Sequence, residues 1–253
     1  MPPSTAVRMA AATGPRSFIL PNCVDLEQFT PGPKNPALLD RYGLHDRTVL
    51  LTVARLSADE RYKGIDEVLE ILPQLVKQIP NLTYLIVGDG TDRARLMAKA
   101  DSLGLTVTDA EARQAPGAER PAVLFTGRIP ESEKVDHYRL ADAFVMPGRG
   151  EGFGIVYLEA LACGVPVVAS KADASQEIVA CIGEGIAVDP DNPDELVQVI
   201  LQLLKTRTCV VAPKLLEFSW ESFCRRCHEI LTGTSFSEGK QCLKVPAARN
   251  VVT

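Results

Sequence analysis

A glycine-rich segment between residues 146 and 166 carries the groups best suited to bind an anionic ligand. Its four glycines at positions 148, 150, 152 and 154 lead directly into a predicted helix over residues 155–162. Glycines leave the backbone N–H groups bare, and the first N–H groups of a helix attract anions. The segment therefore indicates a phosphate or diphosphate site.

Two carboxylates flank the start of this predicted helix. Glu151 precedes the helix, and Glu159 lies two turns into it. A carboxylate can accept hydrogen bonds from two neighbouring sugar hydroxyls, so the pair indicates sugar on both sides of a phosphate. The alternative is a flexible glycine turn in which Glu151 only favours the helix dipole and Glu159 faces solvent. The segment alone leaves both interpretations open.

Two cations follow the first predicted strand, Arg55 and, eight residues later, Lys63. Together they could neutralise a diphosphate and stabilise it as it leaves. The alternative is an ordinary solvated loop of charged residues over 59–63. Gly88-Asp89-Gly90 resembles the start of a dinucleotide fingerprint, but position 93 is arginine, so a tight turn before a helix is favoured.

Alternating strand and helix patterns position these groups. Apolar runs predict six strands, over residues 49–54, 83–87, 123–126, 143–146, 166–170 and 186–188. Helices are predicted over residues 65–78, 92–103, 132–140, 155–162, 174–180, 193–206 and 213–231. This alternation is typical of an α/β fold with a doubly wound, Rossmann-like parallel sheet. Ligands of such sheets bind at the carboxyl ends of the strands, which is where the residues discussed above fall.

Composition and the chain ends set the limits of the domain. Residues 1–17 predict a loose leader and residues 233–253 a disordered tail, which leaves one domain over 18–232. A net charge of −5 with 46% hydrophobic residues excludes a disordered protein and disfavours nucleic-acid binding. Without a long apolar run or a signal sequence, we expect a cytoplasmic protein. The seven cysteines lack a disulfide-framework spacing, so we expect reduced thiols.

Two further motifs have simple explanations. Asp189-Pro190-Asp191 spells an Asp-x-Asp metal motif, but these residue types are typical of a turn before a helix. Residues 224–228 spell the haem-attachment motif Cys-x-x-Cys-His, but they fall in a predicted helix of a chain without an export signal. We therefore predict no metal site and no haem.

Six motifs in order resemble the retaining group-1 glycosyltransferases of GT-B fold. The resemblance covers about residues 18–231 and implies the C-terminal, donor-binding half of that fold. One motif departs from the family, because its Gly-Gly-x-x-Glu keeps Glu177 but has Asp173 and Ala174 instead of the glycines. In chain order, the six motifs are Leu20-Pro21-Asn22-Cys23-Val24-Asp25, Ala54-Arg55-Leu56 with Lys63-Gly64, Val87-Gly88-Asp89-Gly90, Phe125-Thr126-Gly127-Arg128-Ile129-Pro130, the pair Glu151 and Glu159, and Ala162-Cys163-Gly164-Val165-Pro166-Val167-Val168-Ala169-Ser170.

The resemblance implies a role for each matching position. Arg55 and Lys63 would clamp the diphosphate of a UDP- or GDP-sugar, and Glu151 would hold the donor sugar's hydroxyls; we take these three as the catalytic residues. Glu159 would accept hydrogen bonds from the ribose. The other donor-binding residues would be Gly88, Arg128 and Ile129 (the last two against the base), Gly152, Phe153 and Gly154 (sugar), and the amides of Ile155 and Val156 (diphosphate).

The resemblance also implies a reaction. Family members transfer a sugar with retention and stabilise the leaving group with cations and backbone dipoles, so we expect a hexosyltransferase without cofactor or obligatory metal. The acceptor, a glycan or a lipid-linked molecule, would be bound by an N-terminal domain that we expect to be missing here, and the full-length protein could associate peripherally with a membrane. The alternatives are a binding-only fragment or, with no acid/base or pyridoxal-phosphate signature to favour them, an epimerase or phosphorylase of the same fold.

Overall fold

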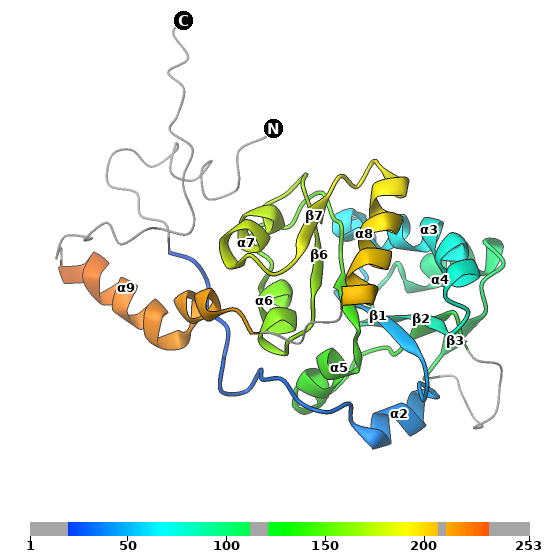
Figure 1. Cartoon of the computed structure of the whole chain (residues 1–253), viewed down its shortest axis with the longest axis horizontal. Coiled ribbons are helices and arrows are strands. Elements are labelled where there is room, and N and C mark those ends of the chain that lie inside the picture. The colour runs from blue at the N-terminus through cyan, green and yellow to red at the C-terminus, as the bar shows by residue number, and fades with distance from the viewer. Residues whose placement is uncertain (1–19, 112–120, 207–210, 233–253) are drawn as a thin grey trace, which may run out of the picture.

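The computed structural model describes residues 20–111, 121–206 and 211–232 and contains a seven-stranded sheet with helices on both faces (Figure 1). The predicted leader (1–17) and the predicted tail (233–253) both lie outside the described residues. All strand pairs in the sheet are parallel. The strands are β1 (Thr48–Val53), β2 (Leu82–Val87), β3 (Val107–Asp109), β4 (Val123–Phe125), β5 (Ala143–Val145), β6 (Val167–Ser170) and β7 (Ile186–Val188).

The strand order determines where a ligand can bind. Across the sheet the order is β3-β4-β2-β1-β5-β6-β7. Strands β2, β3 and β4 therefore lie on one side of β1, and β5, β6 and β7 lie on the other side. The order therefore reverses between β1 and β5. In sheets of this kind the crevice outside the carboxyl ends of the two strands at the reversal is the ligand site. The loops after β1 and β5 are those that carry Arg55 and the glycine-rich segment.

Two apolar cores cover the two faces of the sheet. One core joins the sheet to α3, α4 and α8, and the other joins it to α2, α5, α6, α7 and η3. The helices are α2 (Pro36–Tyr42), α3 (Ile65–Gln78), α4 (Arg93–Ser102), α5 (Lys134–Leu140), α6 (Ile155–Ala162), α7 (Ser175–Ile182), α8 (Pro193–Thr206) and α9 (Trp220–Thr232), with 3₁₀ segments η1 (Ala58–Lys63), η2 (Glu131–Glu133) and η3 (Pro213–Phe218).

The structure confirms the predicted fold class and adds elements that the sequence patterns missed. The seventh strand, β3, has three residues and lies at the sheet edge, so it shows no apolar run. The short α2 was also missed, although Asn35 caps its first turn and Gly43 ends it with a φ of 65°. The helix predicted over 213–231 is two elements, because Ser219 ends η3 and its hydroxyl accepts the N–H of Ser222 at 3.1 Å at the start of α9.

One cysteine contradicts the expectation of reduced thiols. Cys181, near the end of α7, is disulfide-bonded. Cys224 and Cys227, the cysteines of the Cys-x-x-Cys-His motif, are free thiols on α9. A single disulfide depends on which segments fold together, and cysteine spacing along the chain does not contain that information.

Gly88 allows three strand ends to meet closely below the site. It has a φ of +134°, and its N–H donates to the carbonyl of Gly127 beyond β4 at 3.0 Å. A Cβ at this position would lie 1.9 Å from the carbonyl oxygen of Ala54, which follows β1. The backbones after β1, β2 and β4 are therefore packed against one another, and only glycine fits at position 88.

We predict that Gly88→Ala destabilises the protein by about 3 kcal/mol or more, because the new methyl group overpacks against backbone that cannot move independently. Gly104→Ala is the matched control: Gly104 also has a positive φ, +73°, but nothing lies within 4 Å of the place that a Cβ would take. That variant should be destabilised only by the left-handed strain of about 1–2 kcal/mol. Urea unfolding of both variants checks the difference, and equal losses would contradict the proposed packing.

Candidate functional site

The loop after β1 and the glycine-rich loop after β5 pack together backbone to backbone. A Cβ on Gly64 would lie 2.6 Å from the carbonyl carbon of Pro147, and one on Gly148 would lie 2.6 Å from the carbonyl oxygen of Tyr62. That oxygen also accepts the N–H of Arg149 at 2.7 Å. The structure thus brings together the two segments that the sequence singled out separately.

Lys63 and Glu151 face each other across this contact. The Lys63 Nζ lies 2.8 Å from Glu151 Oε2, and the two side chains are only 19% and 17% exposed. Lys63 Nζ also lies 5.5 Å from the centre of the Tyr62 ring, a cation–π distance. A cation predicted to bind diphosphate and a carboxylate predicted to bind sugar are therefore adjacent, as the two ends of one hexosyl diphosphate would require.

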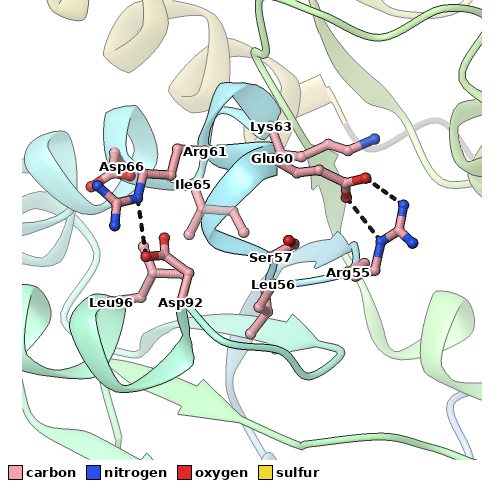
Figure 2. A pocket seen from close by; sticks show the side chains of 10 residues that line it. All are labelled: Arg55, Leu56, Ser57, Glu60, Arg61, Lys63, Ile65, Asp66, Asp92 and Leu96. Carbon is pink, nitrogen blue, oxygen red and sulfur yellow. Dashed lines mark hydrogen bonds and ion pairs between the residues drawn. The ribbon is translucent and has the colours of Figure 1, made fainter.

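Arg55 forms the second charged pair of the site. Its Nε donates to Glu60 Oε2 at 3.1 Å and its terminal nitrogen bonds the other carboxylate oxygen, so the pair is bidentate. The Arg55 side chain is 72% exposed. Figure 2 shows the carboxylate of Glu60 between the side chains of Arg55 and Lys63, and all three residues line a hollow. The hollow is lined by Arg55, Leu56, Ser57, Glu60, Arg61, Lys63, Ile65, Asp66, Asp92 and Leu96.

The start of α6 supplies an uncapped helix end next to these charges. Gly154 precedes the helix with a φ of +86°, and no side chain caps the first turn. The N–H groups of Ile155 and Val156, the first two helical residues, have no acceptor within the helix. Phe153 anchors the loop against Phe218, with ring centres 6.2 Å apart. The uncapped backbone N–H groups that are predicted to bind an anion therefore lie near Glu151, and Gly152 is exposed to solvent.

Glu159 is buried, so the alternative that it faces solvent is wrong. It is 5% exposed, its Oε1 lies 2.7 Å from Lys134 Nζ, and its Oε2 accepts the Tyr138 hydroxyl at 2.6 Å. Burial, together with the nearby Glu159 carboxylate, raises the pKa of Tyr138 well above its ordinary value, so the phenol stays protonated and donates. The ribose contact stays a prediction; each carboxylate oxygen has a further lone pair that a ribose hydroxyl could use.

Arg128 and Ile129 lie further along the same edge of the sheet. They follow β4, which is separated from β1 by β2 and therefore lies about 10 Å from it. Arg128 is exposed and makes no hydrogen bond or ion pair within the described part of the chain, whereas Ile129 packs partly against the core. The predicted base site, diphosphate site and sugar site thus follow one another from β4 to β5.

Asp173 is a residue of this site that the sequence analysis did not assign. It follows β6, at the position where the family pattern has glycine, and its Oδ2 accepts the N–H of Glu151 at 3.1 Å. Its Oδ1 accepts the Ser175 N–H at 2.9 Å and the Ser175 hydroxyl at 2.6 Å. Burial raises the pKa of Asp173, and its bonds to Ser175 and Glu151 oppose that shift. The departure from the glycine pattern was the only sequence signal for this role.

We predict that Asp173→Ala lowers the free energy of unfolding by about 1–3 kcal/mol, because partly buried donors of Glu151 and Ser175 lose their acceptor. It should also weaken any ligand held by Glu151, since the loop is no longer fixed. Asp101→Ala, at an exposed aspartate on α4, should change stability by less than about 0.5 kcal/mol. Thermal unfolding measures both, and an unchanged Asp173→Ala would show that the network does not hold the loop.

The Asp-x-Asp segment forms a turn, as predicted. The N–H of Asp191 donates to the Asp189 carboxylate at 3.0 Å, and Asp191 pairs with Arg149 at 2.6 Å. Among the residues that the structure describes, no group of three or more His, Cys, Asp or Glu side chains could hold a metal ion. In the same ranges, none of the helices combines the length and the apolar character needed to cross a membrane.

Comparisons with known proteins show the family of the chain. Residues 47–206 match the family described as "Glycosyl transferases group 1". A GDP-mannose-dependent alpha-(1-6)-phosphatidylinositol monomannoside mannosyltransferase of Mycolicibacterium smegmatis is 35% identical over 246 residues, which cover 90% of this chain and 60% of the relative. A D-inositol 3-phosphate glycosyltransferase of Catenulispora acidiphila is 35% identical over 184 residues, covering 72% and 41%. This chain thus spans about 60% and 41% of the lengths of these two relatives.

Solved structures share the fold. HepE of Anabaena, in complex with UDP and glucose, superposes with a TM-score of 0.68 and 22% identity over 89% of this chain and 60% of that one. The C-terminal domain of a group 1 family glycosyl transferase, LpcC of Francisella tularensis, superposes with a TM-score of 0.55 and 22% identity, and the match covers 76% of this chain and 96% of that domain.

Proposed function

The chain belongs to the group 1 glycosyltransferases, and we propose that it is the C-terminal, donor-binding domain of a retaining hexosyltransferase that uses a nucleoside diphosphate sugar. One observation carries the proposal. At the reversal point of the sheet, Lys63, Glu151 and the uncapped start of α6 meet within one site, and Arg55 follows β1 beside them. Cations, backbone N–H groups and a carboxylate are the groups that a sugar diphosphate requires.

The chemistry follows from the order of these groups. Departure of the nucleoside diphosphate places negative charge on the phosphate oxygens next to the sugar. Lys63, Arg55 and the positive end of α6 stabilise that charge without a proton transfer. Glu151 orients the sugar through its hydroxyls. The bond from the anomeric carbon to the diphosphate oxygen breaks while the acceptor hydroxyl forms a bond to the same carbon on the same face, so the anomeric configuration is retained. The acceptor hydroxyl gives its proton to the departing phosphate oxygen. No side chain of this domain serves as a covalent nucleophile, and no metal is required.

GDP-mannose is the donor that we favour, with a lipid-linked acceptor such as a phosphatidylinositol mannoside. The support is the function of the M. smegmatis relative, whose match covers 90% of this chain. UDP-sugars are the second candidate, because the structurally similar HepE is in complex with UDP. We propose that acceptor binding lies in the part of such relatives that this match does not cover, so this domain alone should bind donor without transferring it. That result would agree with the binding-only alternative for the chain taken by itself.

We predict that Arg55→Ala, Lys63→Ala and Glu151→Ala each weaken binding of GDP-mannose by about 1.5–3 kcal/mol, the range for charge-assisted contacts. Titration calorimetry against GDP, UDP, ADP and their sugar conjugates, with and without magnesium, measures these losses and identifies the base. Glu151→Ala should affect the sugar conjugate more than the free diphosphate, because its partners are sugar hydroxyls.

Lys205→Ala is the control, because this exposed lysine lies in the last turn of α8. The helix starts after β7 and runs back toward the amino ends of the strands, away from the proposed site. The affinity of Lys205→Ala for GDP-mannose should equal that of the wild type. Unchanged affinity in all three site variants would reject the site, and a strict magnesium requirement would reject the metal-independent mechanism.

A further inference from the structure

Glu60 occupies the position between the two cations that the proposed function assigns to the diphosphate. Both of its carboxylate oxygens bond Arg55, in the bidentate geometry that guanidinium groups also form with phosphate. Figure 2 shows the Lys63 side chain on the other side of the same carboxylate. The bond from Arg55 and the nearby Lys63 charge lower the pKa of Glu60, so it is ionised at neutral pH.

The charges of the site balance without any ligand. Arg55 is paired with Glu60, and Lys63 is paired with Glu151, so the two cations face two carboxylates. The Glu60 side chain is 16% exposed, whereas that of Arg55 is 72% exposed, so the arginine has room to move away from the carboxylate. A diphosphate that enters must exchange the carboxylate for phosphate on Arg55 and must lie near the remaining negative charge of Glu60.

We infer that the Glu60 carboxylate competes with the nucleoside diphosphate for Arg55, and that it lowers the affinity for the product nucleoside diphosphate more than the affinity for the donor sugar. This inference rests on the proposed function. The free nucleoside diphosphate carries an additional negative charge, because its terminal phosphate has a second ionisation near pH 6, whereas the sugar-linked phosphate lacks it. Repulsion from Glu60 therefore acts more strongly on the product, which favours its release after transfer.

The test is calorimetric titration of the full chain in wild-type form and as Glu60→Gln, with GDP, GDP-mannose and inorganic pyrophosphate as probes. Glu60→Gln removes the charge and keeps the shape. We expect GDP and pyrophosphate to bind about three- to tenfold more tightly to the variant. The variant lacks both the partly exposed Arg55–Glu60 ion pair and the repulsion between the Glu60 carboxylate and the phosphates. GDP-mannose should gain a smaller factor. Glu60→Asp keeps the charge and should stay close to the wild type.

Glu70→Gln is the matched control. Glu70 on α3 is also half of an ion pair, with Lys99 at 2.7 Å, but it is 61% exposed and does not line the hollow. Its affinities should change by less than about a factor of two. Equal tightening in both glutamine variants would mean a general charge effect and would overturn the inference.

The remaining outcomes separate the inference from the proposed function. Unchanged or weaker binding by Glu60→Gln would show that Glu60 positions Arg55 instead of competing with the ligand. If pyrophosphate binds and tightens in Glu60→Gln but no nucleotide binds either protein, the competitor role holds and the proposed donor is wrong. If none of the probes binds either protein, both are overturned.

Discussion

The close backbone contact between the loop after β1 and the glycine-rich loop after β5 is the constraint on which the site depends. Gly64 and Gly148 have no room for a side chain, because the backbones of Pro147 and Tyr62 occupy the space where a Cβ would lie. The contact places Lys63 directly opposite Glu151. A larger residue at either glycine would push the loops apart and separate the Lys63 ammonium from the Glu151 carboxylate, which the proposed function assigns to the same ligand.

This contact also changes the meaning of the glycine-rich segment. Glycines in such a loop are usually explained by an anion that approaches the backbone. Here, Gly148 and Gly150 pack against Tyr62, so their first role is to bring two parts of the protein together. The backbone that we propose to bind an anion lies further on, at the start of α6, where no side chain caps the helix. The first part of the glycine-rich segment thus packs against Tyr62, and the last part forms the helix start that we propose as the ligand site.

The loop that contains Arg149 and Glu151 is held by residues to which we assign no contact with the proposed ligand. Asp173 bonds the backbone of Glu151, and Arg149 is tied to Asp191 at 2.6 Å and to Glu67 on α3. Contacts from three different segments therefore hold this loop in the absence of a ligand. Such preorganisation suits electrostatic stabilisation of a leaving group, since the charges need no rearrangement during the reaction. The Arg55–Glu60 pair is the exception, because its arginine is exposed.

Much of the architecture could be predicted from the sequence. The predicted bounds of α3, α6 and α8 agree with the structure, because their amphipathic or continuous apolar patterns begin at clear signals, after Gly64, after Gly154 and at Pro193. The short β3 and α2 were missed because a few residues show no periodicity. The order of the motifs along the chain also predicted the family, which the match over residues 47–206 shows.

The amino-acid sequence by itself determined which residue types follow which strands, and hence the class of ligand that the site suits. Only the tertiary structure decided the partners of those residues: Lys63 with Glu151, Arg55 with Glu60, Glu159 with Lys134 and Tyr138, and Asp173 with the backbone of Glu151. The physical reason is that local patterns act over a few neighbouring residues, whereas an ion pair such as Lys63–Glu151 joins positions 88 residues apart. Such a pair forms only after the sheet has brought two strand ends together.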